Sequence, residues 1–385
     1  MKEIVQKAHS DNAEQRRNRR LEAQSSRRNL SKEDFNLEIS DKEAKTLSNL
    51  CKSGKLTVSQ FRDLSRALSS KPEFSRTFLA SDGCLHGLVG QLTGSDPAKQ
   101  LLALQCLVNL ASQGHKCPLV AKSAGAYLIT LIAGQSYIQF GLNFYDFVTA
   151  GTNKTLAEHS CLVISNLCLT DSLSVPILRN LDAVENLLRL AETSPEASVT
   201  EAALQALYQL VRGEAVTGDT GRLLVTSAIK MLTSRASRDL PPIHLLWLLY
   251  ILSSHQSLHN FLASQTFLYQ CVDIATYEIF QKCDSRPLVK LLTPVVRILA
   301  NLAAGPDSVS VCLTLIRHPD LPAILTALLS TNYLHLCRES LWLFANIVNN
   351  ESVTVQEEFV NQDLMDKLEP HAVQAIGRLD PYALG

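Results

Sequence analysis

The chain has 385 residues, a formal net charge of −1 and a hydrophobic content of 46%, so it can bury a sizeable core and carries no global excess of charge. Its longest uncharged apolar run, residues 243–252, is shorter than the roughly 18 to 20 residues that a membrane-spanning helix needs. No transmembrane span is therefore expected, and the polar, basic first thirty residues do not resemble a signal peptide.

Charge is concentrated at the N-terminal end. Residues 1–32 hold nine Lys or Arg against four Asp or Glu, which gives this arm a net charge of +5 and leaves about −6 for the rest. An arm of this kind binds an acidic partner, folds back on its own scaffold, or is a solvated tail with no specific partner. No nucleic-acid partner is expected, because Phe35 is the first aromatic residue. The arginines of the arm are Arg16, Arg17, Arg19, Arg20, Arg27 and Arg28.

Six apolar stretches with nearly the same ending follow the arm. Successive endings lie 57, 43, 42, 50 and 45 residues apart, which is typical of stacked helical units that bury a common core. Apolar residues recur at helical spacing within them, and period-two alternation is nowhere sustained. The sequence therefore predicts an all-α fold of about six to seven units. One residue near each ending is expected to be buried between units, namely Leu107, Leu167, Leu210, Leu252, Leu302 and Ile347.

Motifs for catalysis or metal binding are scarce. The ten cysteines include no CxxC pair and behave as small apolar residues, which favours a reducing compartment. His255 and His259 have an i, i+4 spacing, but no third ligand follows at a recognisable interval, so no metal site is predicted. We find no nucleophile elbow, P-loop, dinucleotide-binding fingerprint or zinc-protease motif. The sequence favours a binding protein without cofactors over an enzyme.

One ending carries a family resemblance. Residues 339–350 read Glu-Ser-Leu-Trp-Leu-Phe-Ala-Asn-Ile-Val-Asn-Asn and resemble the third helix of an armadillo repeat of the importin-α type, Glu-Ala-x-Trp-Ala-Leu-x-Asn-Ile-Ala. The arginines of residues 16–20 and 27–28 are similar to the importin-β-binding segment of that family. The repeat resemblance covers about residues 60–370 and implies a right-handed α-solenoid of armadillo-like repeats over residues 46–385, after a basic arm over residues 1–45.

The resemblance also implies a function. It points to a non-enzymatic adaptor in protein import into the nucleus, located in the cytoplasm, the nucleus or both. An importin-β-like protein would bind the arm, and a basic or extended peptide would bind the concave face of the solenoid. The alternative is a general protein-interaction scaffold of the armadillo type without transport activity.

The same resemblance assigns partner-binding residues to the concave face, namely Asn109, Asn166, Asn301, Trp342 and Asn346. In such scaffolds the amide holds the peptide backbone and the indole packs against a basic side chain. Equally open is a packing role for Trp342, with Asn346 satisfying a neighbouring carbonyl. Only the last unit has the full Trp–Asn pair, because Gln105, Leu162 and Arg297 stand where Trp is expected in three others, and Arg297 opposes a basic ligand.

Two irregularities remain. The longest step contains an aromatic insertion, residues 137–151, which is either a partner-binding excursion or a tolerated insertion tucked against the scaffold. After residues 364–376 too little chain follows for another unit, so the last repeat is expected to be incompletely capped.

Overall fold

The computed structural model describes residues 40–137, 146–212, 216, 218–234, 240–280 and 285–379. These residues form helices and no strand, so the predicted all-α class is confirmed. The arm arginines, Arg16 to Arg28, lie outside the described residues, as does most of the insertion between Tyr137, where one helix ends, and Asp146, where the next begins. The first described helix begins at Asp41, slightly before the expected boundary at residue 45.

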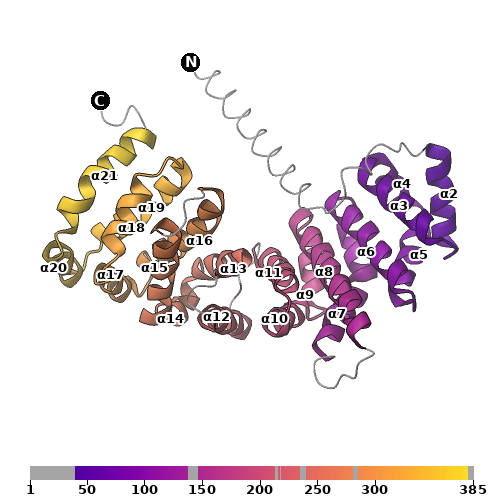
Figure 1. Ribbon diagram of the computed structural model, residues 1–385, viewed down its shortest axis with the longest axis horizontal. Helices are drawn as coiled ribbons and strands as arrows, with labels where there is room; N and C mark the ends of the chain where they lie inside the picture. The colour runs from indigo at the N-terminus through magenta and orange to yellow at the C-terminus, as the bar shows by residue number, and fades with distance from the viewer. Residues whose placement is uncertain are drawn as a thin grey trace, which may run out of the picture.

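The helices form an arch of two main layers (Figure 1). The inner layer consists of seven helices, each of which packs against the next one along the chain. They are α3 (Val58–Ser70), α6 (Pro97–Ser112), α8 (Asp146–Thr170), α11 (Ala197–Val211), α13 (Ile243–Ser253), α16 (Ser285–Ala303) and α19 (Leu334–Val348). All six endings found in the sequence lie on these helices, and α3 adds a seventh that the pattern did not reveal.

The outer layer runs along the convex side, and its helices also pack in chain order (Figure 1). They are α2 (Asp41–Lys52), α5 (Cys84–Gly90), α7 (Cys117–Tyr137), α10 (Ala183–Thr193), α12 (Gly218–Thr233), α15 (Gln265–Phe280), α18 (Leu321–Leu329) and α21 (Leu364–Leu379). Short helices lead into them: α4 (Pro72–Ala80), α9 (Ser174–Arg179), α14 (His259–Leu262), α17 (Ser308–Ile316) and α20 (Val353–Asn361), with the 3₁₀ turns η2 (Gln91–Thr93) and η4 (Gln256–Leu258). This is an α-solenoid of armadillo-like units.

Local signals explain where helices begin. Ser40 and Thr57 form capping boxes with Glu43 and Gln60, which satisfy the first backbone N–H groups of α2 and α3. The side chain of Asp96 accepts hydrogen bonds from the first backbone N–H groups of α6. Each of these capping residues lies next to its helix in the sequence, so these helix starts are encoded locally.

The predicted core residues are buried. Leu107, Leu167, Leu210, Leu252 and Leu302 are fully enclosed, and Ile347 is almost so. Each lies on an inner helix and belongs to one continuous hydrophobic core. The predicted register of the six endings is therefore confirmed.

The helix α7 meets the length and apolarity of a membrane span over Cys117–Gly134, which the sequence analysis had not singled out. The bent pair α17 and α18 passes the same test only if both helices are counted as one span. In the fold, α7 packs against α8 and α10, and Val120, Ala124 and Leu128 are fully buried in the core. Packing within the solenoid therefore accounts for one side of α7, while Leu119 and Tyr127 on the same helix are exposed.

The two ends of the solenoid differ. No large apolar side chain of α2 is exposed, whereas α20 and α21 leave several in solvent. Among the described residues, α21 is the last helix. Arg378 fastens α21 by donating hydrogen bonds to the carbonyl oxygens of Leu329 and Thr331. The exposed residues are Val353, Val360, Met365, Val373 and Ile376.

Replacing Leu302 by Ala should lower the free energy of unfolding by about 2 to 5 kcal/mol, because it leaves a cavity between two units. Chemical denaturation followed by circular dichroism measures the change. Leu223→Ala on α12, where the side chain is exposed, is the matched control and should change stability little. Equal stability of Leu302→Ala and the control would contradict the assigned packing.

Gly305 is required by a close approach. A methyl group at this position would overlap the buried imidazole of His259, whose Nε2 lies 2.7 Å from the carbonyl oxygen of Ser253. We expect Gly305→Ala to destabilise the protein by about 1 to 3 kcal/mol. The double variant Gly305→Ala with His259→Ala should recover part of that loss relative to the sum of the single changes, measured in a double-mutant cycle by thermal unfolding. If the stability changes of the two single variants simply add up in the double variant, residues 259 and 305 are not in contact.

Candidate functional site: the inner face

The five residues assigned to partner binding all lie on inner-layer helices. Asn109 is on α6, Asn166 on α8, Asn301 on α16, and Trp342 and Asn346 lie one turn apart on α19. Their partner-binding role stays a prediction, because the described structure holds no ligand. Their contacts nevertheless show what these side chains do within the scaffold.

Each of the four amides donates a hydrogen bond to the preceding inner helix. Nδ2 of Asn109 donates to the carbonyl oxygen of Ser65 at 3.0 Å, and that of Asn346 to the carbonyl oxygen of Ala300 at 3.0 Å. Asn301 donates to the hydroxyl of Ser253 at 2.9 Å, and Asn166 more weakly to a carbonyl of α6 at 3.4 Å. The amides therefore fasten neighbouring units to each other.

The exposure of each amide determines whether its remaining hydrogen-bonding groups can reach a ligand. Asn109 is only 5% exposed and makes a second bond to the Ser65 hydroxyl. Asn166, Asn301 and Asn346 are half-buried, and an amide has two donors and an acceptor, so each keeps hydrogen-bonding capacity after bonding to the scaffold. Trp342 is 42% exposed on the same side of α19 as Asn346. The Trp342–Asn346 pair is the most accessible part of the predicted site.

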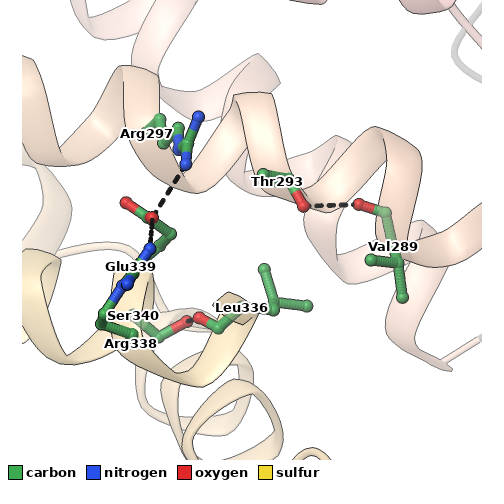
Figure 2. Close-up of polar contacts among 7 residues, drawn as sticks. All are labelled: Val289, Thr293, Arg297, Leu336, Arg338, Glu339 and Ser340. Carbon is green, nitrogen blue, oxygen red and sulfur yellow. Dashed lines mark hydrogen bonds and ion pairs between the residues drawn. The ribbon is translucent and has the colours of Figure 1, made fainter. Parts of the chain in front are cut away.

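Arg297 stands at the centre of a contact network that we call the Arg297 cluster, formed by Trp247, Tyr250, Arg297, Arg338 and Glu339. The guanidinium carbon of Arg297 lies 5.2 Å from the ring centre of Tyr250 and 6.0 Å from that of Trp247. Its Nη2 donates to Oε1 of Glu339 at 2.9 Å, and Arg338 approaches the same oxygen at 3.4 Å (Figure 2). One carboxylate is thus shared by two guanidinium groups from α16 and α19.

Two buried hydroxyls lie on the helices that carry this cluster. Thr293 and Ser340 each donate to the carbonyl oxygen four residues earlier, Val289 and Leu336, at 2.7 and 2.8 Å (Figure 2). Both hydroxyls are thereby satisfied without reaching the inner face. The Arg297 cluster therefore does not use these two hydroxyls.

Opposing effects act on the ionisation of the pair. Burial by itself raises the pKa of Glu339, but the hydrogen bonds and charges of Arg297 and Arg338 outweigh it and hold this pKa below its ordinary value. Burial likewise acts to lower the pKa of Arg297, and the contact with Glu339 raises it overall. Both groups are therefore charged at neutral pH.

A second polar pair joins the preceding units. Nδ1 of His244 on α13 lies 2.5 Å from Oε1 of Glu201 on α11. Tyr208 stands beside it, with its ring centre 6.4 Å from that of His244 and 6.1 Å from that of Trp247. Aromatic side chains therefore continue along the inner face from α11 to α13, next to the Arg297 cluster.

Sequence analysis missed most of these residues. It noted Arg297 only as an obstacle to a basic ligand and did not identify Tyr208, Tyr250, Arg338 or Glu339 as parts of one site. A usable signal existed, because Arg297 and Glu339 are 42 residues apart and Glu201 and His244 are 43 apart, close to the repeat length. Complementary polar residues about one repeat apart indicate contacts between neighbouring inner helices.

No metal site forms in the described part of the chain, where no group of three or more His, Cys, Asp or Glu is placed to hold an ion. The 3₁₀ turn η4 lies between His255 and His259, and the His259 ring is buried in the core. Among the described cysteines only Cys168 is not fully buried, and burial raises its pKa to about 12. The packing role expected for cysteine holds for these residues.

Comparisons with known proteins add the following. The sequence matches no family model and no curated protein. The fold is similar to that of a designed armadillo repeat protein, with a TM-score of 0.49 and 15% identity over 68% of this chain and 99% of the other. It is also similar to an engineered protein of the Northeast Structural Genomics Consortium, with a TM-score of 0.42 and 17% identity over 81% of this chain and 100% of the other.

The Arg297–Glu339 pair should make a pH-dependent contribution to stability. A carboxyl group whose folded pKa lies below its unfolded value, about 4.3, stabilises the fold above that pH and loses the effect as the pH falls through its folded pKa. We expect Arg297→Gln to lower the free energy of unfolding by about 1 to 3 kcal/mol at pH 7, because it leaves the Glu339 carboxylate with a weaker partner. Below about pH 4 the two proteins should differ less in their free energy of unfolding, because Glu339 then becomes protonated.

The control is the double variant Arg297→Gln with Glu339→Gln, which removes both charges and leaves none unpaired. It should be more stable at pH 7 than Arg297→Gln alone and should show a flatter pH dependence. Urea denaturation at a series of pH values measures all three proteins. A pH-independent cost of Arg297→Gln would show that the ion pair does not form.

Proposed function

We propose that the protein is a non-enzymatic interaction scaffold that binds an extended segment of a partner protein along its inner face. The observation that carries this proposal is the row of aromatic and charged side chains on adjacent inner helices, from Tyr208 through Trp247 and Arg297 to Trp342. An arched layer of parallel inner helices offers a long concave surface, which suits an extended peptide.

A selection from a random peptide library tests this proposal. Peptides that bind the parent chain should lose at least about tenfold in affinity when Trp247 and Trp342 are both replaced by Ala, because aromatic anchors dominate such interfaces. The double variant Leu173→Ala with Leu223→Ala removes exposed apolar side chains away from the inner helices and should bind as the parent does. Selected peptides that bind equally to all three proteins would place the binding site elsewhere.

A narrower form of the proposal is an adaptor of the importin-α type for protein import into the nucleus, present in the cytoplasm, the nucleus or both. It is supported by the basic arm, with Arg16, Arg17, Arg19 and Arg20 close together, and by the accessible Trp342–Asn346 pair. In this form the arm binds an importin-β-like protein, and the inner face takes a basic peptide. Arg297 opposes such a peptide, and for this reason the general scaffold is our leading proposal.

Binding to purified importin-β tests the narrower form. Replacement of Arg16, Arg17, Arg19 and Arg20 by Ala should abolish capture by the full chain, because guanidinium groups make charge-assisted hydrogen bonds to acidic surfaces. Replacement of the same four by Lys keeps the charge and should retain part of the binding, which should weaken steeply as salt rises. Capture that is unchanged by the Ala replacements would remove the transport function and leave the scaffold.

A further inference from the structure

The inner face changes in charge toward its C-terminal half. The helices α13, α16 and α19 together contain four Lys or Arg residues, and their single acidic residue is Glu339. In contrast, the next two helices, α20 and α21, carry more Asp and Glu than Lys and Arg. The cations lie on α16 and α19 and are a local feature of a chain whose net charge is −1.

The positions of these cations place them together. Lys290 is exposed and precedes Arg297 by seven residues on α16, a spacing that puts both on one side of the helix. Arg338 on α19 is bonded to the same carboxylate as Arg297, and its side chain is 68% exposed. Trp342 follows Arg338 by four residues on α19 and is also exposed. Cations and an aromatic plane therefore share one accessible surface.

The internal pairing leaves this surface positive. Glu339 is a single carboxylate with one oxygen bonded to both Arg297 and Arg338. A guanidinium has five N–H donors, and one contact with Glu339 leaves most donors of the exposed Arg338 for other acceptors. Meanwhile the Arg297 guanidinium lies over one face of each of the Trp247 and Tyr250 rings. A basic side chain arriving here would meet a cation where it needs an aromatic face.

From this arrangement we propose that the surface formed by Lys290, Arg297, Arg338 and Trp342 binds an acidic, extended segment of a partner protein, whose Asp or Glu carboxylates bond to Arg338 and Arg297. The proposal rests on the scaffold function above and specifies the chemistry of its ligand. Glu339 occupies part of this site as an internal carboxylate, and the ligand supplies further carboxylates to the same two guanidinium groups. Three cations, two of which share an internal carboxylate, suit a short acidic peptide better than a nucleic-acid backbone with its continuous charge.

A titration with the full chain tests the proposal. The probe is a fluorescein-labelled twelve-residue peptide in which Asp alternates with Ser and Gly around a central Tyr, and its affinity is measured by fluorescence anisotropy at fixed salt. Two matched peptides carry Asn or Lys in place of Asp. We expect the Asp peptide to bind more tightly than both, and its affinity to fall as salt rises.

Two variants are expected to change the affinity in opposite directions, and a third is their control. Arg338→Gln should weaken binding of the Asp peptide by about three- to tenfold, because it removes an exposed charge-assisted contact. Glu339→Gln should strengthen binding by a similar factor of about three- to tenfold, because it removes the competing internal carboxylate. Lys367→Gln on the exposed surface of α21 removes one positive charge away from the site and should leave the affinity unchanged. Thermal unfolding shows that each variant is folded.

The possible results separate this inference from the function on which it rests. Tighter binding of the Lys or Asn peptide, with loss on Trp342→Ala, would overturn the acidic ligand and keep the scaffold. The acidic ligand is also overturned if Arg338→Gln and Lys367→Gln have equal effects, or if an oligouridine of the same length binds more tightly than the Asp peptide. Absence of binding by all three peptides would overturn it as well, while the library selection decides the scaffold independently.

Discussion

The structure depends on the packing of each inner helix against the inner helix of the next unit. No unit can bury its own apolar face, so Leu107, Leu210 and Leu302 are enclosed only because a neighbouring unit covers them. The polar contacts follow the same rule, since Asn346 bonds to Ala300 and Arg297 to Glu339, 46 and 42 residues apart. Contacts between units are thus separated by about one repeat length in the sequence, and stability is set by contacts between nearest neighbours.

This arrangement divides the surface of an inner helix into two parts. The buried stripe is restricted to residues that fill the space between units. Asn109 and Asn346 lock the register of neighbouring helices through amide–carbonyl hydrogen bonds. The side that faces the hollow of the arch has no such restriction. It holds Leu162 on α8, Trp247 on α13 and Arg297 on α16 at equivalent positions. The chemistry of the inner face can therefore differ from one unit to the next while the fold stays the same.

The sequence predicted what is local and repeated. Apolar periodicity and the recurring endings placed six inner helices and their buried leucines, because each of these signals lies within a single helix. It could not show that Arg297 stacks on Tyr250 and pairs with Glu339, because those contacts need the register between helices. The i, i+4 spacing of His255 and His259 was also uninformative, since a 3₁₀ turn intervenes and the fold buries His259.

The Arg297 cluster is better explained by positioning than by stability. Removing two ions from water costs free energy that their attraction only partly offsets, so a half-buried pair adds little net stability compared with an apolar pair of similar size. The pair nevertheless fixes the place and orientation of its groups, because a guanidinium held by a carboxylate and two aromatic rings loses most of its rotational freedom. An arginine that is already ordered costs less conformational entropy when a ligand binds. The network therefore holds the Arg297 guanidinium in one place on the inner face.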